Sequence, residues 1–222
     1  MPEVQITNPA GGVLGGDRLE VGVDLAPGAR ATVLTQAANK AYGGPEALQR
    51  TLVRVEVGAV LEYLPHHLIP YAGSDYRQET TFHLAPDAVL LAWDGYAAGR
   101  VARGERFAFR RLRGRTTILR DDRPEAIDGF DLAGVSEPFG GYSYAAGAYV
   151  LAPQDLSPLA EELHASLSGV PGALASASAP APGLCAVRIL TNGAPELYAA
   201  LNAVRELTRS ALSLPAPARE VA

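Results

Sequence analysis

The sequence predicts a mainly β protein whose short strands stack in layers, in the manner of a β-helix, with about two α-helices near the C-terminus. Three observations predict this class. From residue 1 to 120, short runs rich in Val, Leu, Thr and Tyr are separated by Gly, Pro and Asp, without a sustained helical period. Within this region a turn-then-strand pattern recurs at intervals of 30 and 29 residues. Leucines at helical spacing occur only after residue 152.

The strands are predicted from alternation of apolar and polar residues. In the segment DRLEVGVDL, residues 17–25, Leu19, Val21 and Val23 fall on one face, whereas Arg18, Glu20 and Asp24 fall on the other. This alternation is typical of a strand with one buried and one solvated face. By similar criteria we expect strands at 17–25, 30–36, 51–57, 60–64, 76–84, 89–93, 105–111 and 115–120.

The repeat links three of these strands. Its copies are LAPGARATVLTQ from Leu25, VEVGAVLEYLPH from Val55 and LAPDAVLLAWDG from Leu84. Each copy places Gly or Asp, residues that tolerate tight turns, before an alanine and an apolar strand. A repeat of this length made of short strands favours stacked β layers, although an ordinary β-meander would give a similar pattern.

In the C-terminal third, the sequence pattern changes from short strands to amphipathic helices. Residues 153–169 read as an amphipathic helix that begins at Ser157-Pro158, and residues 194–214 read as a second one. Between them, 172–183 reads as strand plus turn or as loop, and 184–192 as a buried strand. We therefore expect a single domain over 1–222, with a β-rich part at 1–152, a helix-strand-helix region at 153–213 and a frayed tail at 214–222.

Composition excludes several classes of function. The formal net charge is −5 and the pI about 5.4, so no overall basic field for nucleic acid is present. A single cysteine, Cys185, excludes an internal disulfide framework and a multi-cysteine metal site. No apolar run is long enough to span a membrane, and the N-terminus does not resemble a secretory signal. We expect a cytoplasmic protein without nucleic-acid or membrane partners.

Basic residues are concentrated in one segment. Nine arginines and three acidic residues lie between Arg100 and Arg123, interleaved with apolar residues as in an antiparallel hairpin with one charged face. Arg110 and Arg111 are the candidate contacts for an acidic partner protein, with an ordinary solvated face as the alternative. A nucleic-acid patch is less favoured, because few aromatic residues accompany the arginines.

Catalytic signatures are scarce. The chain has no G-x-S-x-G nucleophile elbow and no phosphate-binding G-x-x-x-x-G-K-[ST] loop. Glu62 and His66, four residues apart on a strand-like segment, could form a weak site for nickel or zinc. A metal-dependent hydrolase that uses His66, His67 and Asp94 is the alternative function.

Four carboxylates fall at turns or in otherwise apolar strands: Asp17, Glu62, Asp94 and Glu105. A carboxylate near an apolar interior needs a partner or water, so a wet internal channel would explain several of them together. Taken singly, each could instead be a turn or edge-strand acid that is hydrogen-bonded to backbone.

The residues also resemble a known family. NPAGGVLGGDRLEVGVDLAPGARATVLTQAANKAY resembles the signature region of the urease accessory protein UreD family, also called UreH. The likeness continues through GAVLEYLPHHLIPYAGSDYRQETTFHLAPDAVLLAWDGYAAGRVARGERF, the IDG at 127–129 and the final RILTNGAPELYAALNAVRELTR. Relatives carry further strands before the first motif, so the resemblance predicts unpaired sheet edges here.

The resemblance implies a non-catalytic maturation factor with a layered β fold and two helices. Such a protein binds apo-urease and the accessory proteins UreF and UreG, and helps to deliver nickel through an internal passage. It implies no tightly bound cofactor, only transient nickel. The motif positions are Asp17, Asn39, Lys40, Asp94 and Glu105, which become candidates for the nickel path. A structural β-scaffold without metal traffic is a further alternative.

Overall fold

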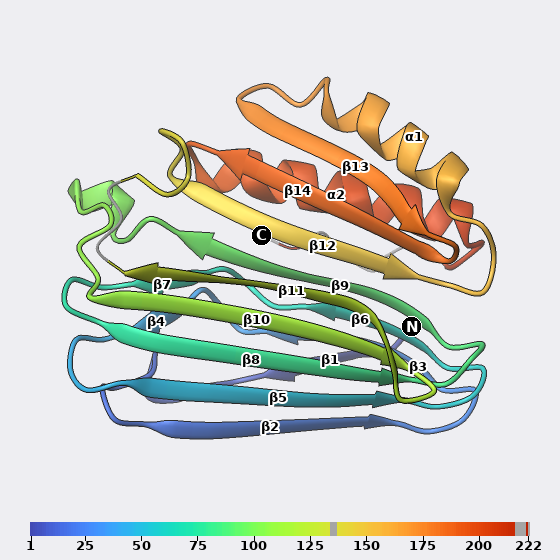
Figure 1. Ribbon diagram of the computed structural model, residues 1–222, viewed down its shortest axis with the longest axis horizontal. Helices are drawn as coiled ribbons and strands as arrows, with labels where there is room; N and C mark the ends of the chain where they lie inside the picture. The colour runs from blue at the N-terminus through green and yellow to red at the C-terminus, as the bar shows by residue number, and fades with distance from the viewer. Residues whose placement is uncertain (134–136, 216–220, 222) are drawn as a thin grey trace.

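Two β-sheets dominate the computed structural model, which describes residues 1–133, 137–215 and 221 (Figure 1). Sheet A has the strand order β1-β3-β6-β9-β12-β14-β13, and β4 and β7 pair with each other beside β9. Sheet B has the order β11-β10-β8-β5-β2. The predicted mainly β class with two helices near the C-terminus is confirmed.

The elements have the following bounds. Sheet A contains β1 (Glu3–Ile6), β3 (Arg30–Thr35), β4 (Asn39–Ala41), β6 (Val60–Leu64), β7 (Leu68–Pro70), β9 (Val89–Ala97), β12 (Tyr144–Leu151), β13 (Ala173–Ala181) and β14 (Leu184–Thr191). Sheet B contains β2 (Arg18–Leu25), β5 (Ala47–Val55), β8 (Asp75–Leu84), β10 (Arg111–Arg120) and β11 (Arg123–Ala133). The helices are α1 (Ser157–Leu167) and α2 (Ala194–Ala211), and a short 3-10 helix spans Val101–Arg103.

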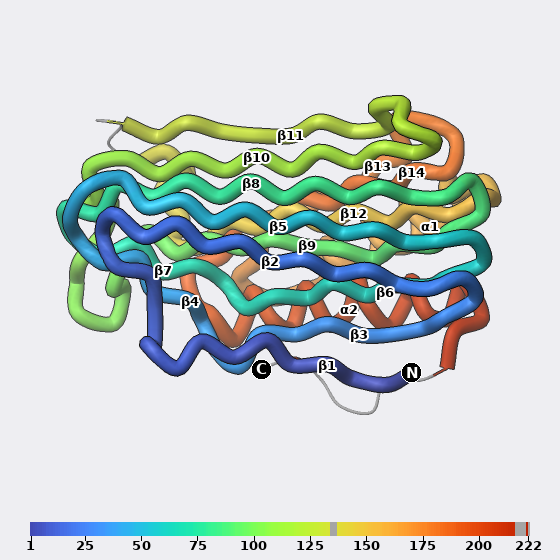
Figure 2. Tube along the Cα trace, turned by 90° about the horizontal axis from the view of Figure 1, so that it is seen from below, coloured from blue at the N-terminus to red at the C-terminus, as the bar shows by residue number. Residues whose placement is uncertain are grey.

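The repeat in the sequence is a coil of stacked strands. From β2 to β10 the chain passes back and forth between the sheets, and equivalent strands of successive turns pair in parallel. In sheet A, Arg30 pairs with Val60 and Val60 with Val89, which are the intervals read from the sequence. Figure 2 shows these strands side by side, with the connecting turns at the two ends of the coil. The layered interpretation is therefore confirmed.

The turn residues of the repeat explain why the copies stack. Gly28 and Gly58 both adopt φ of +68°, a left-handed conformation that glycine accepts without strain. The Gly28 N–H donates to the carbonyl of Val57 in the next turn at 2.8 Å. In the third copy, Asp87 does not have a positive φ, and its carboxylate accepts the Gly58 N–H at 3.0 Å. Each turn is thus bonded to the turn above it.

Three apolar clusters hold the layers together. One packs between the sheets at the Gly28–Gly58 end and includes Val53, Phe82 and Ile118. A second packs between the sheets at the opposite end and includes Tyr76 and Leu112. The third joins sheet A to the helices. The two clusters between the sheets are separate, which leaves the middle of that space for other side chains.

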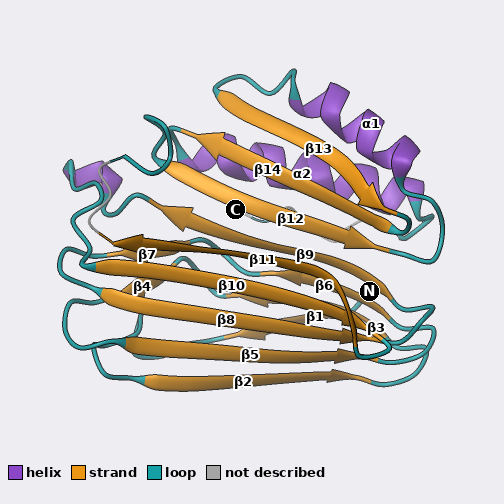
Figure 3. Ribbon diagram, in the orientation of Figure 1, coloured by secondary structure: helices purple, strands orange, loops and turns teal. Residues whose placement is uncertain are grey.

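Both helices cover the same side of sheet A (Figure 3). Helix α1 begins at Ser157, where the Ser157-Pro158 pair predicted its start, and the Asp155 carboxylate accepts the Ser157 N–H at 3.0 Å. Helix α2 turns Leu197, Leu201 and Val204 toward the sheet. None of the described helices has the length and apolar character needed to cross a bilayer.

One predicted hairpin is wrong. The expected strands at 105–111 and 115–120 are not two strands, because β10 runs unbroken from Arg111 to Arg120 and 105–110 contains no strand. The hairpin partner of β10 is β11, which the sequence analysis did not predict. Gly114 lies inside β10, where a Cβ would approach the Phe130 ring at 2.6 Å. The glycine is there for close packing rather than for a turn.

The predicted tail is only partly described. Residues 216–220 and 222 lie outside the described residues. Val221 is buried, and its backbone exchanges hydrogen bonds with the side-chain amide of Asn202 on α2 at 2.9 and 3.0 Å. This residue is therefore anchored rather than frayed.

Candidate functional site

A cavity of about 610 Å³ lies between the two sheets. Its wall combines the N-terminal segment with β2 to β5, β8 and β9. Many of the lining side chains are polar, namely Asn8, Glu20, Thr35, Gln36, Asn39, Lys40, Gln49, His66, Gln78 and Asp94. Space between two sheets is normally filled by apolar side chains, so this polar interior is the candidate site.

The polar interior arises from two layers of the coil. Gln49 on β5 is level with Gln78 on β8. In the neighbouring inward-facing layer, Thr51, Thr80 and Thr116 are level with one another on β5, β8 and β10. These polar layers lie between the apolar layers described above, so the stacking places amides and hydroxyls together in the interior.

Asp94 on β9 is the buried acidic group of this cavity, whereas Glu20, which also lines it, is exposed. Its Oδ1 accepts the Gly147 N–H at 3.3 Å, and its Oδ2 accepts the Thr116 hydroxyl at 3.3 Å and the Tyr96 hydroxyl at 3.4 Å. Burial, followed by the charge of Asp128, raises the pKa of Asp94 to about 6. This carboxyl therefore changes its charge within about one pH unit of pH 6.

Hydrogen bonds continue from Asp94 toward the other end of the cavity. The Gln78 amide donates to the Tyr96 hydroxyl at 3.3 Å. Further along, Gln49 Oε1 accepts the Tyr76 hydroxyl at 3.1 Å and the Asn39 amide at 3.3 Å. Amide and hydroxyl groups thus extend from Asn39 to the Asp94 carboxylate.

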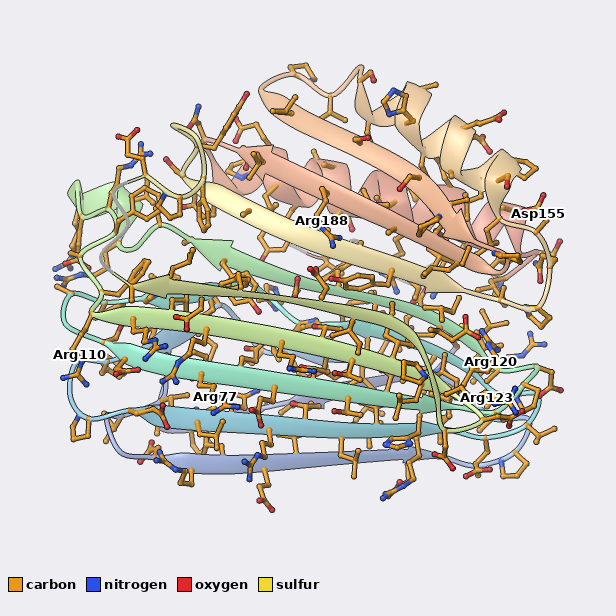
Figure 4. All side chains as sticks on the ribbon, viewed as in Figure 1. Arg77, Arg110, Arg120, Arg123, Asp155 and Arg188 are labelled. Carbon is orange, nitrogen blue, oxygen red and sulfur yellow. The ribbon has the colours of Figure 1, made fainter. Side chains whose placement is uncertain are left out.

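Behind Asp94, a second carboxylate is held by an arginine. Asp128 Oδ2 accepts the Arg188 Nη2 at 2.7 Å and also the Tyr149 hydroxyl. A Cβ on Gly147 would lie 3.1 to 3.3 Å from atoms of Tyr149, Asp94 and Arg188, so these three side chains converge on one point. Figure 4 labels Arg188 on the face of β14 that is turned away from the helices. Sequence analysis missed Arg188 and gave Asp128 no role. The alternation of residues did not reveal β11 as a strand, and it could not show that a side chain of β11 meets one of β14.

The predicted motif residues divide into two groups. Asn39, Lys40 and Asp94 line the cavity together. Asp17 and Glu105 do not line it. The Asp17 carboxylate accepts the Leu14 N–H at 2.9 Å and closes a turn, whereas Glu105 accepts the Ala72 N–H at 3.0 Å and pairs with Arg100.

Glu62 does not combine with His66 as the sequence suggested. Burial alone would raise the pKa of Glu62, but hydrogen bonds from Arg209 and Arg205 on α2 hold it below its usual value. The carboxylate also accepts the Thr32 hydroxyl at 2.8 Å, and it faces α2. His66 lines the cavity instead and contacts Thr35 at 3.1 Å. Strand β6 ends at Leu64 before a proline, so the face shared by i and i+4 in a strand is lost.

The alternative hydrolase site is also not assembled. His67 is buried on the helix side, with Nδ1 2.9 Å from the Tyr198 hydroxyl. Burial, followed by the charge of His66, lowers the pKa of His67 to about 4. Asp94 faces the space between the sheets. Within 1–133, 137–215 and 221, no three His, Cys, Asp or Glu side chains gather closely enough to hold a metal ion.

Arg110 and Arg111, the two predicted partner contacts, lie on the surface and bind other residues of this chain. Arg110 Nη2 donates to the Gly44 carbonyl at 2.9 Å and pairs with Asp75 at 3.2 Å. Arg111 forms a bidentate pair with Asp131, with Nε 2.8 Å from Oδ1. Both side chains remain substantially exposed.

Comparison with known proteins connects the whole chain to one family. The family model described as UreD urease accessory protein matches residues 1–222. The chain is similar to two proteins named urease accessory protein UreD. It is 40% identical to the one from Picosynechococcus sp., over 53% of this chain and 42% of that protein, and 39% identical to the one from Herpetosiphon aurantiacus, over 66% of this chain and 54% of that protein. The protein of that name in Delftia acidovorans is 33% identical over 93% of this chain and 76% of its own length. The chain spans about half the length of the first two relatives.

Proposed function

Because the chain belongs to the UreD urease accessory protein family, we propose that it acts in the maturation of the nickel centre of urease and catalyses no reaction of its own. The observation that carries this proposal is the polar cavity between the sheets, with Asp94 inside it. Nickel is the cargo of this cavity rather than a resident cofactor.

The ligands in the cavity suit transient rather than permanent binding. The polar part of its wall offers mainly amide, hydroxyl and carboxylate oxygens, whereas nickel binds most tightly where several imidazole or thiolate ligands converge. Asn39, Gln49 and Gln78 would replace part of the water around the ion, and Asp94 would supply the balancing charge. A site of this kind can release the ion to a stronger site in urease.

The protonation state of Asp94 would control how strongly the cavity attracts a divalent cation. The neutral carboxyl has little attraction for a divalent cation, and the ionised carboxylate attracts it. With a pKa near 6, the group is mainly ionised at neutral pH and can still be neutralised by a modest shift in its surroundings. Lys40, also on the cavity wall, opposes cation entry by its own charge.

The partners in this proposal are apo-urease and the accessory proteins UreF and UreG, in the cytoplasm. The sequence has no phosphate-binding loop, so nucleotide hydrolysis would be supplied by a partner. Arg110 and Arg111 belong to the basic surface that would face an acidic partner, and Asp17 and Glu105 would support the path indirectly by holding turns.

Reconstitution tests the proposal. Apo-urease is activated by the accessory proteins with wild-type chain, with Asp94→Asn or with the matched surface variant Asp24→Asn, and its nickel content is measured by mass spectrometry. We expect Asp94→Asn to lower the initial rate of nickel loading by about tenfold, the effect of about 1.4 kcal/mol, and Asp24→Asn to leave it unchanged. Full nickel loading without any form of this chain would contradict the function itself.

A further inference from the structure

A shallow depression of about 550 Å³ lies on the outer face of sheet B, over β8, β10 and β11. Four arginines contribute to its wall, namely Arg77, Arg111, Arg113 and Arg115. Their alternation along β10 is the charged face that the sequence indicated. Figure 4 labels Arg77 on this side of the molecule. In a chain with a net charge of −5, this concentration of guanidinium groups is a local exception.

The arginines of the depression are unequally engaged in the fold. Arg77 pairs with Glu79, Arg111 with Asp131, and Arg113 with Glu46 and Asp75. Arg115 is exposed, and its side chain makes no hydrogen bond or ion pair with any residue that the structure describes. In Arg113, the Nε atom is buried and likewise lacks a partner within that set. The exposed Arg115 guanidinium therefore remains available to an external acid, whereas the buried Arg113 Nε is not accessible to one.

Beside these donors the surface is flat and partly apolar. Gly129 on β11 lies opposite Arg115 in the ladder and has no side chain to cover the backbone. Two residues away, Ile127 is 57% exposed, which is unusual for a large apolar side chain. A neighbouring chain could therefore approach the β11 backbone closely at this point.

Strand β11 is also an edge. It is the terminal strand in the order of sheet B and pairs with β10 alone among the described strands. In an antiparallel ladder, alternate N–H and C=O groups point away from the partner, so the outer side of β11 has backbone groups that no described strand pairs, although the Gly129 N–H donates to the Asp128 carboxylate at 2.9 Å. Figure 2 shows β11 at the border of the molecule.

We propose that β11 and the depression beside it bind an extended acidic segment of a partner protein by strand addition. The backbone of that segment pairs with the edge of β11, its carboxylates face Arg115, and its apolar side chains cover Ile127 and Gly129. A nucleic acid is disfavoured, because Phe130, the aromatic residue of the depression, packs inward against Tyr96 at 4.8 Å between ring centroids.

This inference specifies the partner surface of the proposed function and rests on that function for the existence of a partner. It moves the centre of the contact from Arg110 and Arg111 to Arg115, since the first two already have acceptors in the fold. It does not depend on the nickel path through the cavity.

The test uses a fluorescein-labelled peptide of eight residues that alternates glutamate with valine, with fluorescence anisotropy as the readout. We expect wild-type chain to bind it with a Kd of about 10–100 μM, and Arg115→Glu to weaken binding by at least about tenfold. The matched control is Arg54→Glu, which makes the same charge change on another exposed arginine of sheet B, 52% exposed at its side chain and paired with Asp24. This control should bind as wild type does.

A second peptide separates strand addition from simple charge attraction. The same sequence with alternate amides N-methylated on the edge that would face β11 keeps every carboxylate but cannot pair with a strand. We expect it to bind at least about tenfold more weakly. Equal binding of both peptides, equal weakening by the two arginine variants, or no binding by wild type at 1 mM would each overturn the proposal. Peptide binding that persists while nickel loading is independent of this chain would overturn the proposed function and leave the surface intact.

Discussion

Glu62 on β6 and Arg205 on α2 form a fully buried ion pair, with Nη2 2.9 Å from Oε2. The two residues are 143 positions apart, and Arg209, one helical turn further on, contacts the same carboxylate. Two guanidinium groups therefore share the Glu62 carboxylate beneath α2. This cluster fixes the helix on the coil by charge as well as by apolar packing.

Replacement of Glu62 by Gln should therefore destabilise the protein strongly. The amide keeps the shape of the side chain but removes the negative charge that both buried guanidinium groups contact, which should lower the free energy of unfolding by about 3–5 kcal/mol. Urea denaturation measures the change. Glu161→Gln on the exposed face of α1 is the control and should change stability by less than about 0.5 kcal/mol. Similar small effects from both variants would mean that the buried cluster does not hold α2.

Asp94→Asn should stabilise the protein above pH 6. The pKa of Asp94 is raised from 3.8 to about 6, so the folded state binds the proton more tightly than the unfolded state. Stability is then lost as pH rises from about 4 to 6 and stays lower at higher pH, and an uncharged Asn removes this loss. We expect a gain of about 1–2 kcal/mol at pH 8 and none at pH 4, measured by urea denaturation. A constant difference across this range would show that Asp94 is not the titrating group.

His67 should make the protein sensitive to acid. Its pKa is lowered from 6.5 to about 4, so the folded state needs the neutral ring beside Tyr198. Stability is fully present above pH 6.5 and is lost as pH falls toward 4, by about 2–3 kcal/mol in total. His67→Gln should flatten this part of the profile, whereas His164→Gln on α1 should keep the wild-type slope. Parallel profiles for all three proteins would contradict the assignment.

Arg188→Ala should raise the pKa of Asp94 further. The Arg188 charge favours the ionised form of Asp94, while burial and Asp128 oppose it. Without the guanidinium, Asp128 also loses a hydrogen bond at 2.7 Å. Carbon-13 NMR of the aspartate carboxyls measures the titration, and we expect a shift upward by about 0.5–1 unit. Arg188→Lys, which retains the charge, should restore most of the wild-type value, and an unshifted titration in Arg188→Ala would exclude this coupling.

The coil could be predicted from the sequence because its information is local and periodic. Turn residues at Gly28 and Gly58 recur at the interval by which the strands stack, so the order of the layers follows from the amino-acid sequence alone. The unbroken strand β10 could not be predicted, because Gly114 gives the same signal as a turn glycine until the Phe130 ring is in place.

The candidate site was only partly predictable. Asp94, Asn39 and Lys40 came from motif positions, and the structure places them on one cavity wall. The polar layers around Gln49 and Gln78 were not predicted, because polar residues in alternating strands are normally taken to face solvent. The arginine partners of Glu62 lie too far along the chain for any local pattern to reveal them.

The separation of the two apolar clusters between the sheets has a mechanical consequence. Val53 and Phe82 belong to one cluster and Tyr76 to the other, with the amide and hydroxyl layers between them. A hydrated ion that enters this middle region can exchange water for amide, hydroxyl and carboxylate groups, while the apolar clusters on both sides stay packed. The two sheets can thus stay fixed relative to each other while a hydrated ion enters and leaves the cavity between them.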